Sequence, residues 1–110
     1  MNGDSTIDKL APVRVRFVVR CHEQAVRMTA LREQLMAKSI TDPDFEELAR
    51  LCHSLYGTGG TLGYKALSAL AYEAESACKP VLAAYKAGAF DPPAALDDLL
   101  KKLIAALEAL

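Results

Sequence analysis

The sequence predicts an all-α protein, an antiparallel up-down four-helix bundle. Two observations support this prediction. Apolar residues recur every three or four residues along most of the chain, and short runs containing proline, glycine or aspartate divide it into four segments. Short connections favour antiparallel neighbours. The 110 residues, 52% hydrophobic and 25% charged, fit one globular domain with a single core.

The first helix is predicted from Val13 to Lys38, with Phe17 and Cys21 among its apolar positions. Residues 1–12 are expected to form a flexible N-terminal segment, so that the domain spans residues 13–110. The start of this helix alternates like a strand. A strand there would have no partner elsewhere in the sequence, which favours a helix.

The second helix is predicted to begin at the Thr41-Asp42-Pro43 run and to end at Gly63, because a capping side chain and an early proline begin helices and glycine ends them. The third should run from Tyr64 to Lys86. Pro80 lies inside it, and we expect a kink there or a break into two shorter helices.

The last helix is predicted to be capped by Asp91, ahead of Pro92 and Pro93, and to continue to Leu110. Leucine dominates its apolar stripe, which indicates one face packed against the core. Whether an apolar edge of this helix forms dimers is left open, and a monomer is the default expectation.

His53 lies opposite the apolar stripe of the second helix, so its imidazole is expected to face water. Gly57 and Gly60 follow on the same side. A glycine inside a helix costs on the order of 1 kcal/mol relative to alanine, so something other than stability must favour these two. Small residues there would leave the imidazole accessible to another macromolecule.

An accessible histidine can act as a nucleophile, because its ordinary pKa of about 6.5 leaves much of it neutral near pH 7. A lone exposed histidine is more often an ordinary surface residue. The neighbouring glycines favour the functional interpretation.

The run from His53 to Gly63, followed by Leu67, Leu70 and Glu75, resembles the histidine-containing phosphotransfer (HPt) domain of two-component phosphorelays. The family pattern has an apolar residue two positions after the histidine, usually a basic residue at three, glycine at four, and then small residues. This chain departs at one position, where Tyr56 replaces the basic residue. Arg50, one turn before the histidine, could supply charge instead, and Tyr56 could serve as a docking aromatic.

The resemblance implies that His53 accepts a phosphoryl group from a phosphoaspartate on a response-regulator receiver domain and passes it to another receiver. It implies a hybrid histidine kinase as a further partner. Beside the imidazole, Arg50, Tyr56, Gly57 and Gly60 are expected to be the docking residues. The chain would be a phosphocarrier rather than an enzyme. It would need no cofactor of its own, because the magnesium ion belongs to the receiver domain.

Composition excludes other classes. A net charge of −1 does not indicate the basic surface that binds nucleic acid. The chain has neither an apolar run of the roughly 20 residues that span a bilayer nor a signal peptide. A cytoplasmic protein without membrane contact is therefore expected. Cys21, Cys52 and Cys78 are interpreted as reduced core residues. A metal site at Cys21-His22 or Cys52-His53 is disfavoured because adjacent helical side chains diverge.

Two alternatives remain for the function. The chain could be a non-phosphorylated four-helix interaction module that binds a receiver or kinase, although nothing in helix physics would then require His53 beside glycines. A bundle that holds a cofactor would need polar ligands facing inward, and the apolar stripes contain none at helical spacing.

The first helix offers a second docking candidate near its start, at Val15, Val18, Val19 and His22. Core packing is the favoured interpretation of these valines, and His22 is more often a surface residue. Tyr64 falls near the His53 side by helical angle, but Gly63 is expected to change the chain direction before it.

Overall fold

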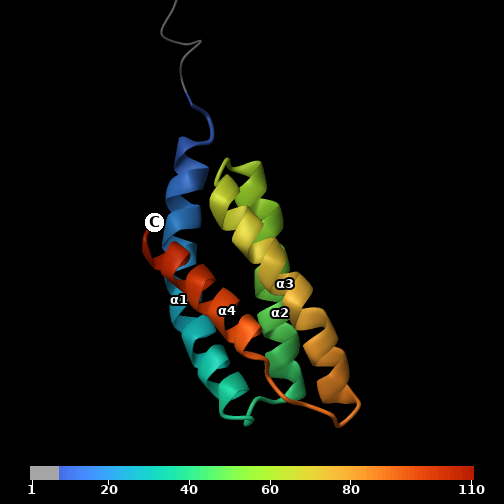
Figure 1. Cartoon of the computed structure of the whole chain (residues 1–110). Coiled ribbons are helices and arrows are strands. Elements are labelled where there is room, and N and C mark those ends of the chain that lie inside the picture. The colour runs from blue at the N-terminus through green and yellow to red at the C-terminus, as the bar shows by residue number, and fades with distance from the viewer. Residues whose placement is uncertain (1–7) are drawn as a thin grey trace, which may run out of the picture.

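The computed structural model describes residues 8–110, which form four helices joined by short turns (Figure 1). These are α1 (Ala11–Met36), α2 (Asp42–Thr61), α3 (Lys65–Lys86) and α4 (Ala94–Glu108). Successive helices run in opposite directions, and no strand occurs in residues 8–110. The predicted all-α, up-down antiparallel bundle is confirmed.

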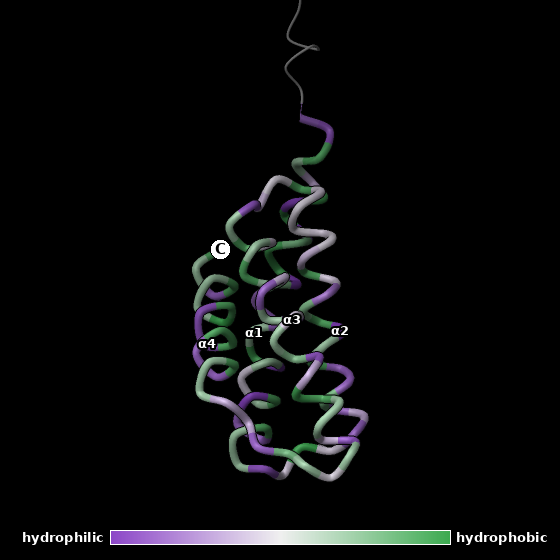
Figure 2. The backbone as a smooth tube through the Cα atoms, turned by 45° about the vertical axis from the view of Figure 1, so that its right-hand side comes forward, coloured by the Kyte–Doolittle hydropathy of each residue, from purple (hydrophilic) through white to green (hydrophobic). Residues whose placement is uncertain are grey.

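Helices α2 and α3 share the most extensive contact, α4 packs against α1 and α3, and the contact of α1 with α2 is lighter. Helix α4 is the shortest and stops below the α2–α3 turn, so that end of the bundle consists of three helices (Figure 1). Helix α4 has hydrophilic residues on one side and hydrophobic residues on the other (Figure 2). Its buried residues are Leu96, Leu100, Leu103, Ile104 and Leu107.

The core runs the length of the bundle and draws on all four helices. Its largest fully buried side chains include Phe45, Met28 and Leu31. The three cysteines are also buried and free, as the sequence predicted. Burial raises the pKa of the Cys21 thiol to about 11, which keeps it protonated and unreactive near neutral pH.

Helix α1 begins at Ala11, two residues before the predicted start, because Pro12 is tolerated in the first turn of a helix. Residues 1–7 of the predicted flexible segment lie outside the described residues. Helix α2 begins as predicted. The Thr41 hydroxyl accepts a hydrogen bond from the backbone N–H of Asp44, and Gly63, with a φ of +92°, follows its end.

Helix α3 is continuous through Pro80, so the predicted alternative of two shorter helices is wrong. The prediction that Asp91 caps the last helix is also wrong. The residue before α4 is Pro93, which has an extended backbone and provides no side-chain cap. Two consecutive prolines hold the residues before them extended, which keeps Asp91 out of the capping position.

The favoured interpretation of the α1 valines as core residues is wrong for two of them. Val15 and Val19 are 65% and 56% exposed, whereas Phe17 and Cys21 on the same helix are buried. Val18 is half-buried. The apolar alternation at the start of α1 therefore places valines on the outer surface of the bundle.

Two groups of ion pairs join α1 to α2 and to α4. Arg27 binds Glu47 and Asp44 of α2, with its Nη2 at 2.7 Å from Glu47 Oε1. Arg32 binds Asp97 of α4, and Lys101 contacts the same carboxylate. The hydrogen bond from Arg32 lowers the pKa of Asp97.

We expect Asp97→Asn to destabilise the fold by about 1 kcal/mol at pH 7, because a charge-assisted hydrogen bond between half-buried groups is lost. A carboxylate whose pKa is lowered on folding stabilises above its unfolded pKa, and this contribution disappears as the pH falls through the folded value. The difference from wild type, measured by urea unfolding, should therefore shrink below about pH 4. Asp98→Asn, at an exposed neighbour, is the control. Equal losses in both variants, or a loss independent of pH, would contradict this role.

Candidate functional site

His53 lies near the middle of α2 and its side chain is 72% exposed. The buried residues of this helix, Cys52 and Leu55 among them, lie on another face. The predicted exposure of the imidazole is therefore confirmed.

The imidazole has a partner that was not assigned from the sequence. His53 Nδ1 lies 2.8 Å from Glu75 Oε2 on α3, and the Glu75 side chain is only 11% exposed. One signal was available, because Glu75 is the only acid among the buried residues of α3 in the described chain, between Ala74 and Cys78 along one face.

This contact fixes the tautomer of a neutral His53. A carboxylate only accepts hydrogen bonds, so Nδ1 carries the proton and donates it to Glu75. Nε2 then keeps its lone pair. The geometry therefore favours an imidazole whose nucleophilic atom is Nε2 and whose orientation is held from α3.

Two shallow hollows border His53. The first lies between α1 and α2 and includes Leu10, Val13 and Gly57, while the second includes Ala49, Arg50 and Glu75. Leu10 and Val13 are 41% and 36% exposed. The imidazole thus lies between a hollow lined in part by the apolar side chains of Leu10 and Val13 and a second hollow lined by both charged and apolar residues.

The glycines of α2 differ in their surroundings. A Cβ on Gly57 would meet nothing within 4 Å, which leaves space beside His53. A Cβ on Gly60 would lie 3.2 Å from Ser68 Oγ, and one on Gly59 would contact α3 backbone at 3.7 Å. Gly60 therefore allows α2 and α3 to approach closely, a Cβ on Gly59 would make ordinary contacts with the start of α3, and Gly57 faces open space.

A protein-family model described as Hpt domain matches residues 17–110. The chain belongs to the Hpt domain family. The match covers most of α1 and all of α2, α3 and α4, and so includes both His53 and Glu75. Neither a search of curated proteins nor a search of solved structures found a match.

Membership establishes the general role. Hpt domains carry phosphoryl groups on histidine in phosphorelays, and they interact with receiver domains and kinases. The chain is accordingly a phosphocarrier rather than a conventional enzyme. No helix in residues 8–110 is long and apolar enough to cross a membrane.

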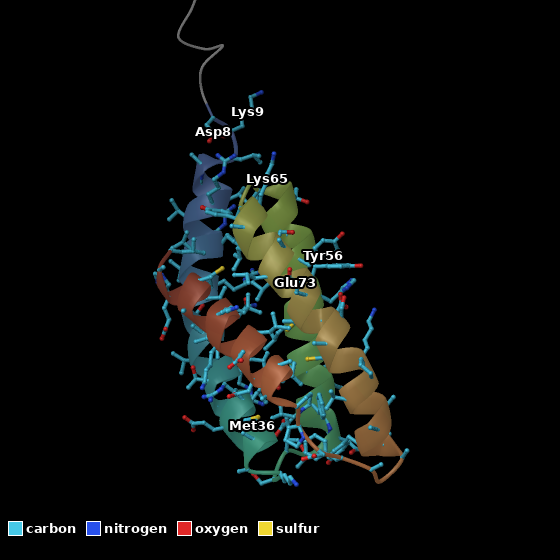
Figure 3. All side chains as sticks on the ribbon, in the orientation of Figure 1. Asp8, Lys9, Met36, Tyr56, Lys65 and Glu73 are labelled. Carbon is cyan, nitrogen blue, oxygen red and sulfur yellow. The ribbon has the colours of Figure 1, made fainter. Side chains whose placement is uncertain are left out.

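Tyr56, at the position where the Hpt pattern usually has a basic residue, is 41% exposed and packs against Tyr72 of α3, with ring centroids 5.0 Å apart. It projects from α2 level with Glu73 (Figure 3). Its backbone carbonyl accepts a hydrogen bond from Ser68 Oγ at 2.7 Å. The substitution thus replaces a cation with part of an exposed aromatic pair.

Of the other two candidates, Arg50 is exposed and borders a hollow that His53 also lines. Tyr64 is elsewhere. Its ring stacks on Phe17 of α1 with centroids 5.3 Å apart, so it belongs to the packing between α1 and the start of α3.

The surroundings of the glycines predict different effects of the same substitution. Gly57→Ala should stabilise the fold by up to about 1 kcal/mol, because it gains helix propensity without a clash. Gly60→Ala should lose most or all of that gain, because the Ser68 hydroxyl that it meets is held by its bond to Tyr56. Thermal unfolding of the two variants checks this. An equal rise in Tm for both would contradict the packing role of Gly60.

Proposed function

We propose that His53 is the phosphorylated residue of this Hpt domain, taking a phosphoryl group from the phosphoaspartate of one receiver domain and delivering it to another. The observation that supports this most strongly is the imidazole itself, which is 72% exposed and has its Nδ1 2.8 Å from a carboxylate oxygen of the largely buried Glu75. The only other histidine, His22, lies on the exposed surface of α1 and has no acidic partner in residues 8–110.

In the proposed reaction, Nε2 of neutral His53 attacks the phosphorus. The N–P bond forms as the bond between phosphorus and the aspartyl oxygen breaks, and the aspartate leaves as a carboxylate. The imidazole becomes cationic while Nδ1–H remains bonded to Glu75. A carboxylate in this position stabilises that cation and holds the ring in the attacking orientation.

The remaining catalytic groups belong to the receiver domain. Its acidic pocket and magnesium ion would stabilise the charge on the transferring phosphoryl group. This division suits an exposed histidine, because the second protein must approach the imidazole closely. Among residues 8–110 no cluster of three or more metal-ligating side chains occurs.

Docking would involve the surface around the imidazole. We assign to it Arg50, Tyr56 and Gly57, together with the exposed side chains of Leu10 and Val13. Gly60 contributes through the packing of α2 on α3. A hybrid histidine kinase is the proposed source of the phosphoryl group. The three buried free cysteines are consistent with a reducing compartment, for which we propose the cytoplasm.

Phosphoryl transfer should depend on His53 and not on His22. Labelled, phosphorylated receiver domains incubated with the wild-type chain should produce an alkali-stable, acid-labile label. His53→Gln should abolish the label with little change in thermal stability, because an exposed helical side chain contributes little packing. His22→Gln is the matched control and should retain it. Receiver binding without any label on the wild type would instead favour the interaction-module alternative.

Glu75 should affect the rate of transfer without being phosphorylated. Glu75→Ala should slow it by roughly tenfold to a hundredfold, as for other groups that orient a reactive histidine. Glu75→Gln should lose less, because its amide oxygen still accepts from Nδ1. Glu73→Gln, an exposed acid on the same helix, is the control. Single-turnover rates of transfer at saturating receiver concentration measure the effect. A wild-type rate in Glu75→Ala would contradict the proposal that Glu75 orients the imidazole.

A further inference from the structure

The outer face of α1 carries valines that no part of residues 8–110 covers. Val15, Val19 and Val26 are 65%, 56% and 74% exposed. At about 100° per residue they fall within about 40° of one another, opposite the buried Phe17 and Met28. His22 lies between them on the same face and is exposed. The series 15, 19, 22 and 26 has the alternating spacing of four and three residues that forms helix–helix seams.

This valine face is distinct from the surface at His53. The hollow beside the imidazole is bordered by Leu10, which precedes α1, and by Val13, which lies on the opposite side of α1 from the valine face. Val15 and Val19 instead border a separate hollow with Arg14 and Tyr64. The valine face and the imidazole therefore border different hollows.

We propose that the valine face of α1 binds the same face of a second copy of this chain, with the two α1 helices antiparallel about a two-fold axis. In this register Val15 meets Val26 of the second copy, and Val19 meets His22 of the second copy. Each contact occurs twice, as the symmetry requires. This proposed dimer differs from the monomer that is the default expectation from the sequence.

Charge complementarity selects this partner and this direction. Arg16 and Glu23 lie seven residues apart on one side of the valine face, both are exposed, and neither is in an ion pair within residues 8–110. In the antiparallel register, Arg16 faces Glu23 of the second copy, and Glu23 faces Arg16. In a parallel, in-register pair, Arg16 and Glu23 would each face the other flank of the partner's valine face. Neither residue would then meet an opposite charge.

The size of the face sets the expected affinity. Three valines and one ion pair per copy make a contact at the low end of protein interfaces, so the dimer should form weakly, at micromolar concentrations or above. Because the valine face is on α1 and His53 is on α2, each copy in the dimer should still accept phosphoryl groups.

Sedimentation equilibrium of the full chain between about 10 μM and 1 mM tests the proposal. Wild type should show a reversible monomer–dimer equilibrium. Arg16→Glu and Glu23→Arg should each raise the dimer Kd on the order of tenfold, by placing like charges together. The double variant carrying both substitutions should restore the wild-type Kd, because the pair is only exchanged between copies. Val26→Asp should give a monomer, and circular dichroism should show that each variant folds.

A monomeric wild type over this range would overturn the proposal, as would a dimer that the single charge reversals leave unchanged. A double variant no better than the single ones would overturn the antiparallel register. If the wild type is monomeric and Val26→Asp weakens transfer from a phosphorylated receiver, the valine face belongs to receiver docking instead. His53→Gln should dimerise like wild type, which separates this result from failure of the phosphorelay role.

Discussion

The contact between His53 Nδ1 and the Glu75 carboxylate depends on the register of α2 against α3, and so does most of the site. The same antiparallel register brings Tyr56 against Tyr72 and, further along, Phe45 against Tyr85 with ring centroids 5.6 Å apart. A slip of one residue would turn Glu75 away from the imidazole by about 100°. The most extensive contact between helices in the bundle is therefore also the one that positions the His53 side chain.

The register of α2 against α3 is held where the C-terminal end of α2 approaches the start of α3 closely. Gly60 admits the start of α3, and the Ser68 hydroxyl binds the backbone carbonyl of Tyr56 inside the narrow gap. Larger residues would separate the helices and move Glu75 with them. The glycine-rich run thus has two physical roles, since Gly57 alone faces open space next to His53. Its helix-propensity cost is offset in part by packing and in part by access to the imidazole.

The sequence was sufficient to predict what depends on local periodicity: four helices, their antiparallel order and the exposure of His53. It was insufficient where two helices had to be aligned, because periodicity gives the face of a residue and not its partner. Glu75 was visible as an acid at a core position, yet only the register shows that it reaches the imidazole. The prediction that Asp91 caps α4 was wrong because the two prolines that follow it keep the chain extended, and this effect outweighs the preference of aspartate for the capping position. The interpretation of the α1 valines as core residues was wrong because hydrophobicity alone does not distinguish a core residue from one on an exposed face.

The charges around His53 explain why a partner is needed for the proposed chemistry. In the proposed reaction Glu75 would stabilise the cationic imidazole that forms on phosphorylation, but a carboxylate also repels an incoming phosphoryl group. A basic residue at position 56 would offset that repulsion, and this chain has Tyr56 there, which leaves Arg50 as the cation bordering the same hollow. The contact with Glu75 therefore orients a neutral imidazole with its Nε2 lone pair free, but it does not attract phosphate. Stabilisation of the transferring charge must come from the receiver domain, which makes transfer depend on docking rather than on the Hpt domain alone.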